Sequence, residues 1–179
     1  MARVHSDGVA RCGWLNDDPL YIDYHDNEWG TPLSGDDAMF ERLSLEGFQA
    51  GLSWLTILKR RVGFREAFHG FKLERVASMT PKDVDRLLVF EGIIRHRGKI
   101  ESTIKNAGLA LRLPDGLEKF VLDFTPDVNR RGLSRSPESE AMSKALRKLG
   151  FGFVGPTTMH ALMQATGMIA DHDAECFRN

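Results

Sequence analysis

The sequence has 179 residues, of which 42% are hydrophobic, and a formal net charge of -1. These values suit one globular domain with a substantial core, and the near-zero charge gives no overall attraction to nucleic acid or to a membrane surface. The chain carries no signal or transit peptide pattern, no apolar run near the ~20 residues of a membrane span, and too few cysteines for a disulfide framework, so we expect a cytoplasmic protein without a membrane partner.

The apolar spacing is helical along the chain, and no sustained period-two run between turn residues indicates a strand. We therefore expect an all-α fold in which residues 1–10 are a flexible N-terminal tail and residues 11–179 form a single globular domain. The segment from 130 to 148 has six Lys or Arg against two Glu, which allows a local basic face.

Two dense stretches lie in the first third of the chain. The stretch YIDYHDNEWG, residues 21–30, sets two tyrosines and Trp29 around His25, and LEGFQAGLSW, residues 45–54, ends a helix that starts near Asp36. In that second stretch Glu46 lies among apolar side chains, which favours a partly buried carboxyl with a raised pKa, although lone helical glutamates are more often solvated. The three tryptophans could be core residues or could line a pocket for a flat, polar heterocycle.

The later helices carry clear start and stop signals. Thr80-Pro81 and Ser136-Pro137 each place a capping residue before a helix-starting proline, and Gly150 is placed to end the helix that begins near residue 137. A further helix begins at Gly155-Pro156. The short glycine-containing connection could present amides to a backbone phosphate, or it could be an ordinary helical turn. The longest irregular connection, residues 113–136, contains one short predicted helix.

Four metal-binding side chains lie near the two ends of the chain, Cys12 and His25 in one segment and His172 and Cys176 in the other. Two thiolates and two imidazoles suit zinc, and four protein ligands leave no open position for water, so the site would be structural and not that of a zinc hydrolase. The alternative is that the cysteines are buried small hydrophobic residues and the histidines ordinary surface residues.

Six motifs in series closely resemble the 3-methyladenine DNA glycosylase I family across about residues 11 to 176: RCGW, DPLYIDYHDNEWG, LEGFQAGLSWLTILKRR, GIIRHRGKI, SKALRKLGFGFVGPTT and DHDAEC. The resemblance implies a helix-hairpin-helix DNA glycosylase fold, with the helix-hairpin-helix at about 136–170 and one structural zinc ion joining the N- and C-terminal segments. It also implies that 3-methyladenine is excised from double-stranded alkylated DNA by base flipping, leaving an abasic site and the released base.

The resemblance also assigns roles to residues. The implied zinc ligands are Cys12, His25, His172 and Cys176. The implied catalytic residue is Glu46, which recognises the methylated base, and the implied substrate-binding residues are Tyr24, Trp54, Tyr21, Trp14 and Trp29. The implied DNA contacts are Gly51 and Leu52, in the gap left by the flipped nucleotide, and Gly152, Gly155 and Thr157 in the hairpin.

Several points are not covered by these motifs. Family members often carry Trp-Ser-Phe where this chain has Leu122-Asp123-Phe124, so the pocket wall or the long connection is expected to differ in shape. We expect little catalytic role for Asp171 and Asp173, which flank a zinc ligand, and the group that activates water has no assignment. Candidate phosphate contacts are Arg95, Arg97, Lys99, Lys144 and Lys148. A monomer is the simplest expectation, and the alternative function is a DNA-binding module that recognises alkylation damage without cutting.

Overall fold

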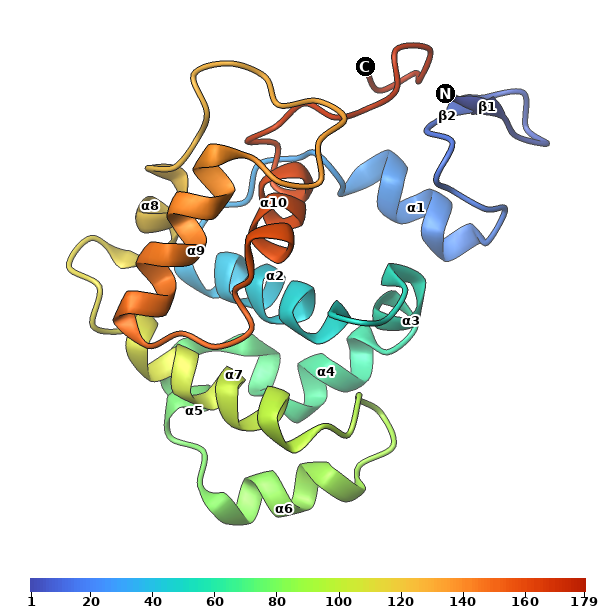
Figure 1. The fold of residues 1–179 in the computed structure, drawn as a ribbon. Coiled ribbons are helices and arrows are strands. Elements are labelled where there is room, and N and C mark those ends of the chain that lie inside the picture. The colour runs from blue at the N-terminus through green and yellow to red at the C-terminus, as the bar shows by residue number, and fades with distance from the viewer.

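The computed structural model describes all 179 residues, and ten α-helices dominate it (Figure 1). The elements are β1 (Arg3–Val4), β2 (Ala10–Arg11), α1 (Pro19–Asn27), α2 (Asp36–Gln49), α3 (Trp54–Leu58), α4 (Arg61–Ala67), a 3-10 turn (His69–Phe71), α5 (Leu73–Ala77), α6 (Pro81–Val89), α7 (Arg97–Ala110), α8 (Gly116–Leu122), α9 (Pro137–Leu149) and α10 (Pro156–Ala165). The expectation of a mainly helical fold is confirmed. No helix combines the length and the apolar character needed to cross a membrane.

Helix α2 runs through the centre of the molecule and packs against α3, α5, α7, α8 and α10 (Figure 1). Every residue from Arg42 to Phe48 is buried, because neighbouring helices surround this part of α2 on all sides. Phenylalanine rings fill the space between α2 and α4, with Phe48 4.6 Å from Phe64 between ring centroids. Burial on all sides brings two charged residues of α2, Arg42 and Glu46, into the interior.

The predicted helix boundaries are confirmed where the sequence carries capping signals. At α6 the Thr80 N–H and hydroxyl both donate to the Asp83 carboxylate, which completes a capping box. At α9 the Ser136 side chain accepts from the Ser139 N–H, and Gly150 ends the helix with a φ of 98°, a conformation that costs glycine little. The connection 113–136 contains one helix, α8, as expected.

The N-terminal segment contains two short strands that the apolar spacing did not predict. Residues Arg3–Val4 and Ala10–Arg11 pair as a two-stranded antiparallel sheet, with a turn around Gly8, whose φ is 79°. Two-residue strands are too short to show a period-two pattern, so hydrophobic spacing could not predict them.

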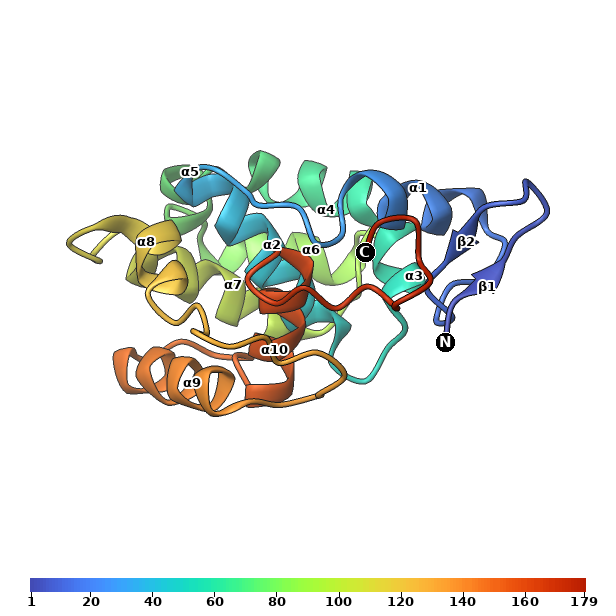
Figure 2. The same ribbon diagram turned by 90° about the horizontal axis from the view of Figure 1, so that it is seen from above.

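The two chain ends lie side by side (Figures 1 and 2). The Phe177 N–H donates to the Ala10 carbonyl at 3.0 Å, and the Gly13 N–H donates to the Asp173 carboxylate at 2.8 Å. These contacts place the predicted metal-binding residues of the two ends next to one another.

Candidate active site and metal centre

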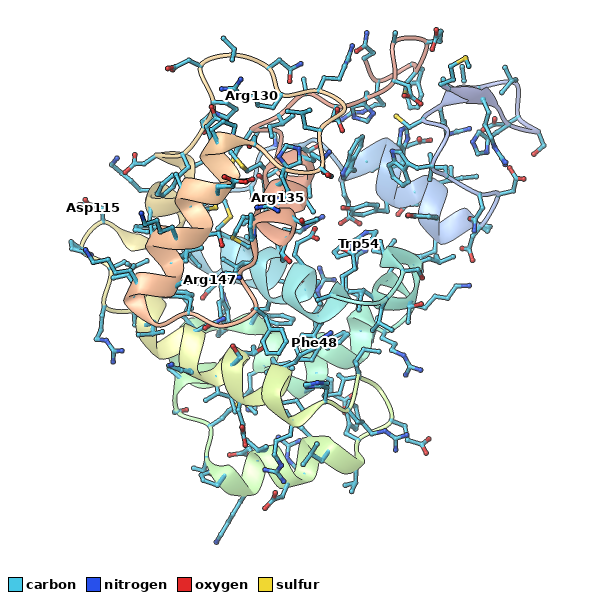
Figure 3. The ribbon with its side chains drawn as sticks, viewed as in Figure 1. Phe48, Trp54, Asp115, Arg130, Arg135 and Arg147 are labelled. Carbon is cyan, nitrogen blue, oxygen red and sulfur yellow. The ribbon has the colours of Figure 1, made fainter.

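A cavity of about 220 Å³ opens between α1, α2, α3 and α10. It is lined by Trp14, Tyr21, Tyr24, Trp29, Glu46, Gln49, Trp54, Ala161, Gln164 and Asp171. Trp54 lies where α1, α2 and α3 meet (Figure 3). All six residues that the sequence places in a base pocket line this one cavity. Its volume suits one small heterocycle and is below the range typical of drug-sized ligands.

Glu46 is the buried carboxyl group of the cavity. Its side chain is only 4% exposed and accepts no hydrogen bond from any protein group. Burial raises the pKa of Glu46 to about 7, although the positive charge of Arg42 acts in the opposite direction. The raised pKa expected from the sequence is confirmed, and the unpaired carboxyl group can accept hydrogen bonds from a ligand.

Aromatic rings form the walls of the cavity. The Tyr24 and Trp54 ring centroids lie 5.4 Å apart, and Trp14 packs against Tyr21 at 5.1 Å and Trp29 at 5.0 Å. The Trp54 Nε1 atom is buried without a hydrogen-bond partner. The walls therefore offer flat apolar faces to a bound ring.

Four lining residues were not predicted: Gln49, Ala161, Gln164 and Asp171. Gln49 lies three positions after Glu46, so helical spacing could have identified it. Asp171 was expected to have little role in catalysis, yet it lines the cavity and accepts hydrogen bonds from the Gly132 N–H and from Gln164 Nε2, each at 2.6 Å. Asp173 instead binds the Gly13 N–H. No local sequence signal brings Asp171 to the cavity, because the C-terminal segment reaches it through tertiary packing.

Leu122, Asp123 and Phe124 do not line the cavity. Phe124 packs on Phe120, with ring centroids 5.6 Å apart, and the Asp123 carboxylate pairs with Lys119. The difference from the family motif therefore lies at the end of α8, outside the cavity wall.

The four predicted metal ligands come together in one buried cluster. Their ligand atoms all lie within 4.8 Å of one another. Cys12 Sγ lies 3.5 Å from His172 Nδ1, and Cys176 Sγ lies 3.5 Å from His25 Nε2 and 3.6 Å from His172 Nδ1. A tetrahedral zinc ion with Zn–S of about 2.3 Å and Zn–N of about 2.0 Å separates sulfur from nitrogen by about 3.5 Å. The residues therefore fit a four-coordinate metal ion.

Burial affects metal binding by His172 and by Cys12 in opposite directions. Burial lowers the pKa of His172 to about 4, so this imidazole is neutral and free to donate an electron pair. Burial raises the pKa of Cys12 to about 12, so a metal ion must displace the thiol proton when it binds.

A second layer orients His25. The Asp26 carboxylate lies 2.8 Å from His25 Nδ1, which leaves Nε2 facing the Cys176 sulfur. Burial acts to raise the pKa of Asp26, but hydrogen bonds from Arg11 and His25 outweigh it and lower the pKa. Gly30 packs closely against His172 on the other side of the cluster. Its φ is 76°, and an added Cβ would lie 3.0 Å from His172 Nε2, so both the backbone conformation and the available space favour glycine.

The predicted DNA-contact residues lie on two exposed turns. Gly51 and Leu52 connect α2 to α3, and the apolar Leu52 side chain is 40% exposed. Gly155 and Thr157 begin α10, and their N–H groups have no acceptor within the protein. Gly152 differs from its prediction as an outward-facing amide, because its N–H donates to the side chain of Asn106 on α7.

Several cations that could contact phosphate are already engaged. Lys99 is buried, and its Nζ donates to the carbonyls of Phe48 and Ala50, so it is unsuited to bind phosphate. Arg97 pairs with Asp85 and Glu101. In the basic 130–148 segment two of the six cations are paired with acids of α9, Arg130 with Glu138 and Arg135 with Glu140. Arg147 lies beside the segment that enters α10 (Figure 3).

Comparison with known proteins places the chain among glycosylases. Residues 14–179 match the model of a family described as methyladenine glycosylase. The chain is 48% identical to DNA-3-methyladenine glycosylase 1 of Escherichia coli (strain K12), over 94% of this chain and 96% of that protein. It superimposes on a crystal structure of 3-methyladenine DNA glycosylase I with a TM-score of 0.89 at 45% identity, covering 93% of this chain and 98% of the other. A variant of 3-methyladenine DNA glycosylase I in complex with 3-methyladenine matches with a TM-score of 0.88 at 34% identity, covering 94% and 96% of the two chains.

Proposed function

This chain belongs to the methyladenine glycosylase family, and on that premise we propose that it excises 3-methyladenine from alkylated double-stranded DNA as a base-excision repair glycosylase. One observation carries the proposal for this site. A buried carboxyl group without a protein partner, Glu46, lies in a cavity walled by aromatic rings.

The chemistry of the lesion explains why such a cavity is selective. Methylation at N3 gives adenine a positive charge, and a dry aromatic box with a carboxylate favours a cationic ring over a neutral one through cation-π contacts and charge-assisted hydrogen bonds. A cation near Glu46 also stabilises its ionised form, so binding of the charged base favours the carboxylate as the hydrogen-bond acceptor. Asp171 adds a second carboxyl group to the cavity wall.

The reaction breaks the bond between C1′ of the deoxyribose and N9 of the base. The bonding electron pair leaves with the base, which departs as neutral 3-methyladenine without needing a proton, and water adds to C1′ to leave an abasic site. Flipping the nucleotide out of the duplex costs a few kcal/mol of stacking and pairing. On this proposal Tyr24 hydrogen-bonds near the base, Trp54 stacks on it, and the other aromatic residues of the cavity, Trp14, Tyr21 and Trp29, enclose it.

The two exposed turns supply the DNA contacts in this proposal. Helices α9 and α10 with their connection act as the helix-hairpin-helix, and the free amides of Gly155 and Thr157 at the start of α10 suit a backbone phosphate. The exposed Gly51-Leu52 turn occupies the gap left by the flipped nucleotide. One chain provides the cavity and both turns, so we propose that the enzyme acts as a monomer, with residues 11–179 as its single domain.

A structural zinc ion completes the proposal. Cys12, His25, His172 and Cys176 would hold it, and it would join the two chain ends without taking part in the reaction, because all four positions are filled by protein. Two thiolate ligands require reduced cysteines, which agrees with the cytoplasmic location we propose.

The experiment is incubation with methylated DNA followed by chromatography of the released bases, for the wild type and Glu46→Gln. We expect free 3-methyladenine with little 7-methylguanine from the wild type, and a release rate at least tenfold lower from the variant. Glu41→Gln, a partly exposed residue of the same helix, is the matched control. Binding of methylated DNA without any released base would overturn the proposal in favour of a damage-binding module.

A further inference from the structure

Arg42 is a buried arginine behind the base cavity. It lies four positions before Glu46 on α2, so the two side chains project from the same face of the helix. Arg42 is only 7% exposed, and it is not among the residues that line the cavity. A buried guanidinium group has a high desolvation cost unless its N–H groups are paired, so its partners indicate what it does there.

The partners of Arg42 belong to the cavity wall. Its Nη1 donates to the Tyr24 hydroxyl oxygen at 2.7 Å, and its guanidinium carbon lies 5.2 Å from the Tyr24 ring centroid and 5.7 Å from that of Trp54. Its Nη2 lies 3.5 Å from the Glu28 carboxylate, which forms two hydrogen bonds with Arg61. A network of paired side chains, Arg61–Glu28–Arg42, therefore links α4, the C-cap of α1 and α2, and it ends at the Tyr24 hydroxyl.

The hydrogen bond from Arg42 fixes the direction of the Tyr24 hydroxyl. An arginine can only donate, so the tyrosine oxygen acts as acceptor toward Arg42 and its own hydrogen must point elsewhere. No protein atom accepts that hydrogen, and Tyr24 lines the cavity together with Glu46. The cavity thus presents a hydroxyl donor from Tyr24 and, when Glu46 is ionised, a carboxylate acceptor.

We propose that Arg42 is a positioning residue that sets base specificity, by holding the Tyr24 hydroxyl as a donor toward the bound base. The inference rests on the proposed function and extends it to a residue outside the cavity. Adenine presents a ring-nitrogen acceptor (N7) beside an amino donor (N6) on one edge, which matches a hydroxyl donor beside a carboxylate. In 7-methylguanine the methyl group occupies N7, so this edge has no ring-nitrogen acceptor for the Tyr24 hydroxyl, and the O6 acceptor would face the Glu46 carboxylate without a hydrogen.

The positive charge of Arg42 also affects Glu46, the acceptor that lies in the cavity with the Tyr24 donor. It opposes the burial that raises the pKa of Glu46, so Arg42 favours the carboxylate form that can accept from an amino group. Tyr24 and Asp171 line the same cavity as Glu46, and Glu28, which follows α1, pairs with both Arg42 of α2 and Arg61 of α4. Of these groups, the Arg42 guanidinium is the charge that lowers the pKa of Glu46.

The test is a double-mutant cycle between Arg42→Met and Tyr24→Phe, read out as release of 3-methyladenine and 7-methylguanine from methylated DNA. We expect Arg42→Met to lower kcat/KM for 3-methyladenine about tenfold and to narrow its preference over 7-methylguanine. Measured well above pH 7, where Glu46 is ionised, Arg42→Met should change that preference little in the Tyr24→Phe background, because the hydroxyl is already gone. Arg42→Met should also move the acid limb of the pH profile to higher pH, and Arg42→Lys should partly restore it.

Arg65→Met is the matched control. Like Arg42, Arg65 pairs with an acidic side chain of another segment, in its case Glu41 of α2, but it does not line or adjoin the cavity. Thermal denaturation and the tryptophan fluorescence of the protein without ligand check that each variant is folded. The inference is overturned if Arg42→Met behaves as Arg65→Met does. It is also overturned if Arg42→Met and Tyr24→Phe act independently, so that the change in base preference of the double variant is the product of the two single changes. If the wild type releases no 3-methyladenine, the proposed function is overturned and the inference with it. If the inference alone fails, the wild type still releases 3-methyladenine, so the two failures are distinguishable.

Discussion

The side-chain amide of Asn106 binds both polar groups of the Gly152 backbone. Asn106 Nδ2 donates to the Gly152 carbonyl at 3.0 Å, and the Gly152 N–H donates to Asn106 Oδ1 at 2.9 Å. Helix α7 thereby holds the connection between α9 and α10 in a defined position, although α7 is distant from it in sequence.

Replacing Asn106 with alanine should therefore weaken duplex binding. We expect a loss of several-fold, because the α10 amides would no longer be held in place for a phosphate. Binding of free 3-methyladenine should be unchanged, since Asn106 does not line the base cavity. Fluorescence anisotropy with labelled duplex measures DNA binding, and tryptophan fluorescence measures binding of the free base. The control is Asn27→Ala, which removes an exposed side-chain amide that donates to Asp23. Equal duplex affinity of Asn106→Ala and wild type would contradict the prediction.

Glu46 should make the protein less stable as pH rises. Burial raises its pKa from 4.5 to about 7, so between these values the folded state holds a proton that the unfolded chain has released. Stability therefore falls as pH increases through this window, by about 3 kcal/mol in total. Glu46→Gln should have a higher Tm than wild type at pH 8 and a similar Tm near pH 4.5, with Glu41→Gln following wild type. A pH-independent difference in Tm would argue against this assignment.

Loss of Cys176, one of the four proposed metal ligands, should destabilise the fold. Cys176→Ser loses one of four ligands in a buried cluster, and we expect the free energy of unfolding to drop by several kcal/mol together with loss of bound zinc. A chelator should lower the Tm of the wild type toward that of the variant. Elemental analysis and thermal denaturation measure both effects, and an unchanged Tm in the variant would count against a structural metal.

The carboxylate behind His25 should tune metal affinity without providing a ligand. Asp26→Asn keeps the shape of the side chain but removes the charge that holds His25 Nδ1 at 2.8 Å. We expect zinc affinity to fall about 10- to 100-fold, as for other partners of ligating histidines. Competition with a zinc-binding dye measures this. Asp23→Asn, an exposed position of the same helix, is the control, and equal affinity of Asp26→Asn and wild type would exclude the role.

Lys99 should act on stability and not on DNA binding. Its buried ammonium donates to two carbonyls at the C-terminal end of α2, Phe48 at 2.8 Å and Ala50 at 2.7 Å. Lys99→Met leaves both without a donor, which should cost about 1–3 kcal/mol in urea denaturation. The slope of duplex affinity against salt concentration should remain that of the wild type, whereas a true phosphate contact would reduce it by about one ion.

The predictions from sequence succeeded where local chemistry decides the structure. Proline after a capping residue, at Thr80 and Ser136, and glycine in the left-handed conformation at 150 each define a helix end within a few residues. The two-residue strands near the N-terminus and the engaged amide of Gly152 were missed, because both depend on partners that no spacing rule links to them.

The sequence by itself determined the helical fold, the ligand types for one metal ion and the motifs that resemble a glycosylase family, because capping, hydrophobic period and ligand chemistry are local properties. Only the tertiary structure decided that Glu46 is unpaired, that Arg42 donates a hydrogen bond to Tyr24 from behind the cavity, that Asp171 lines the cavity and that Lys99 is buried. These features depend on which helices surround α2. The desolvation and hydrogen bonding of a charged group follow from the neighbours that packing brings to it.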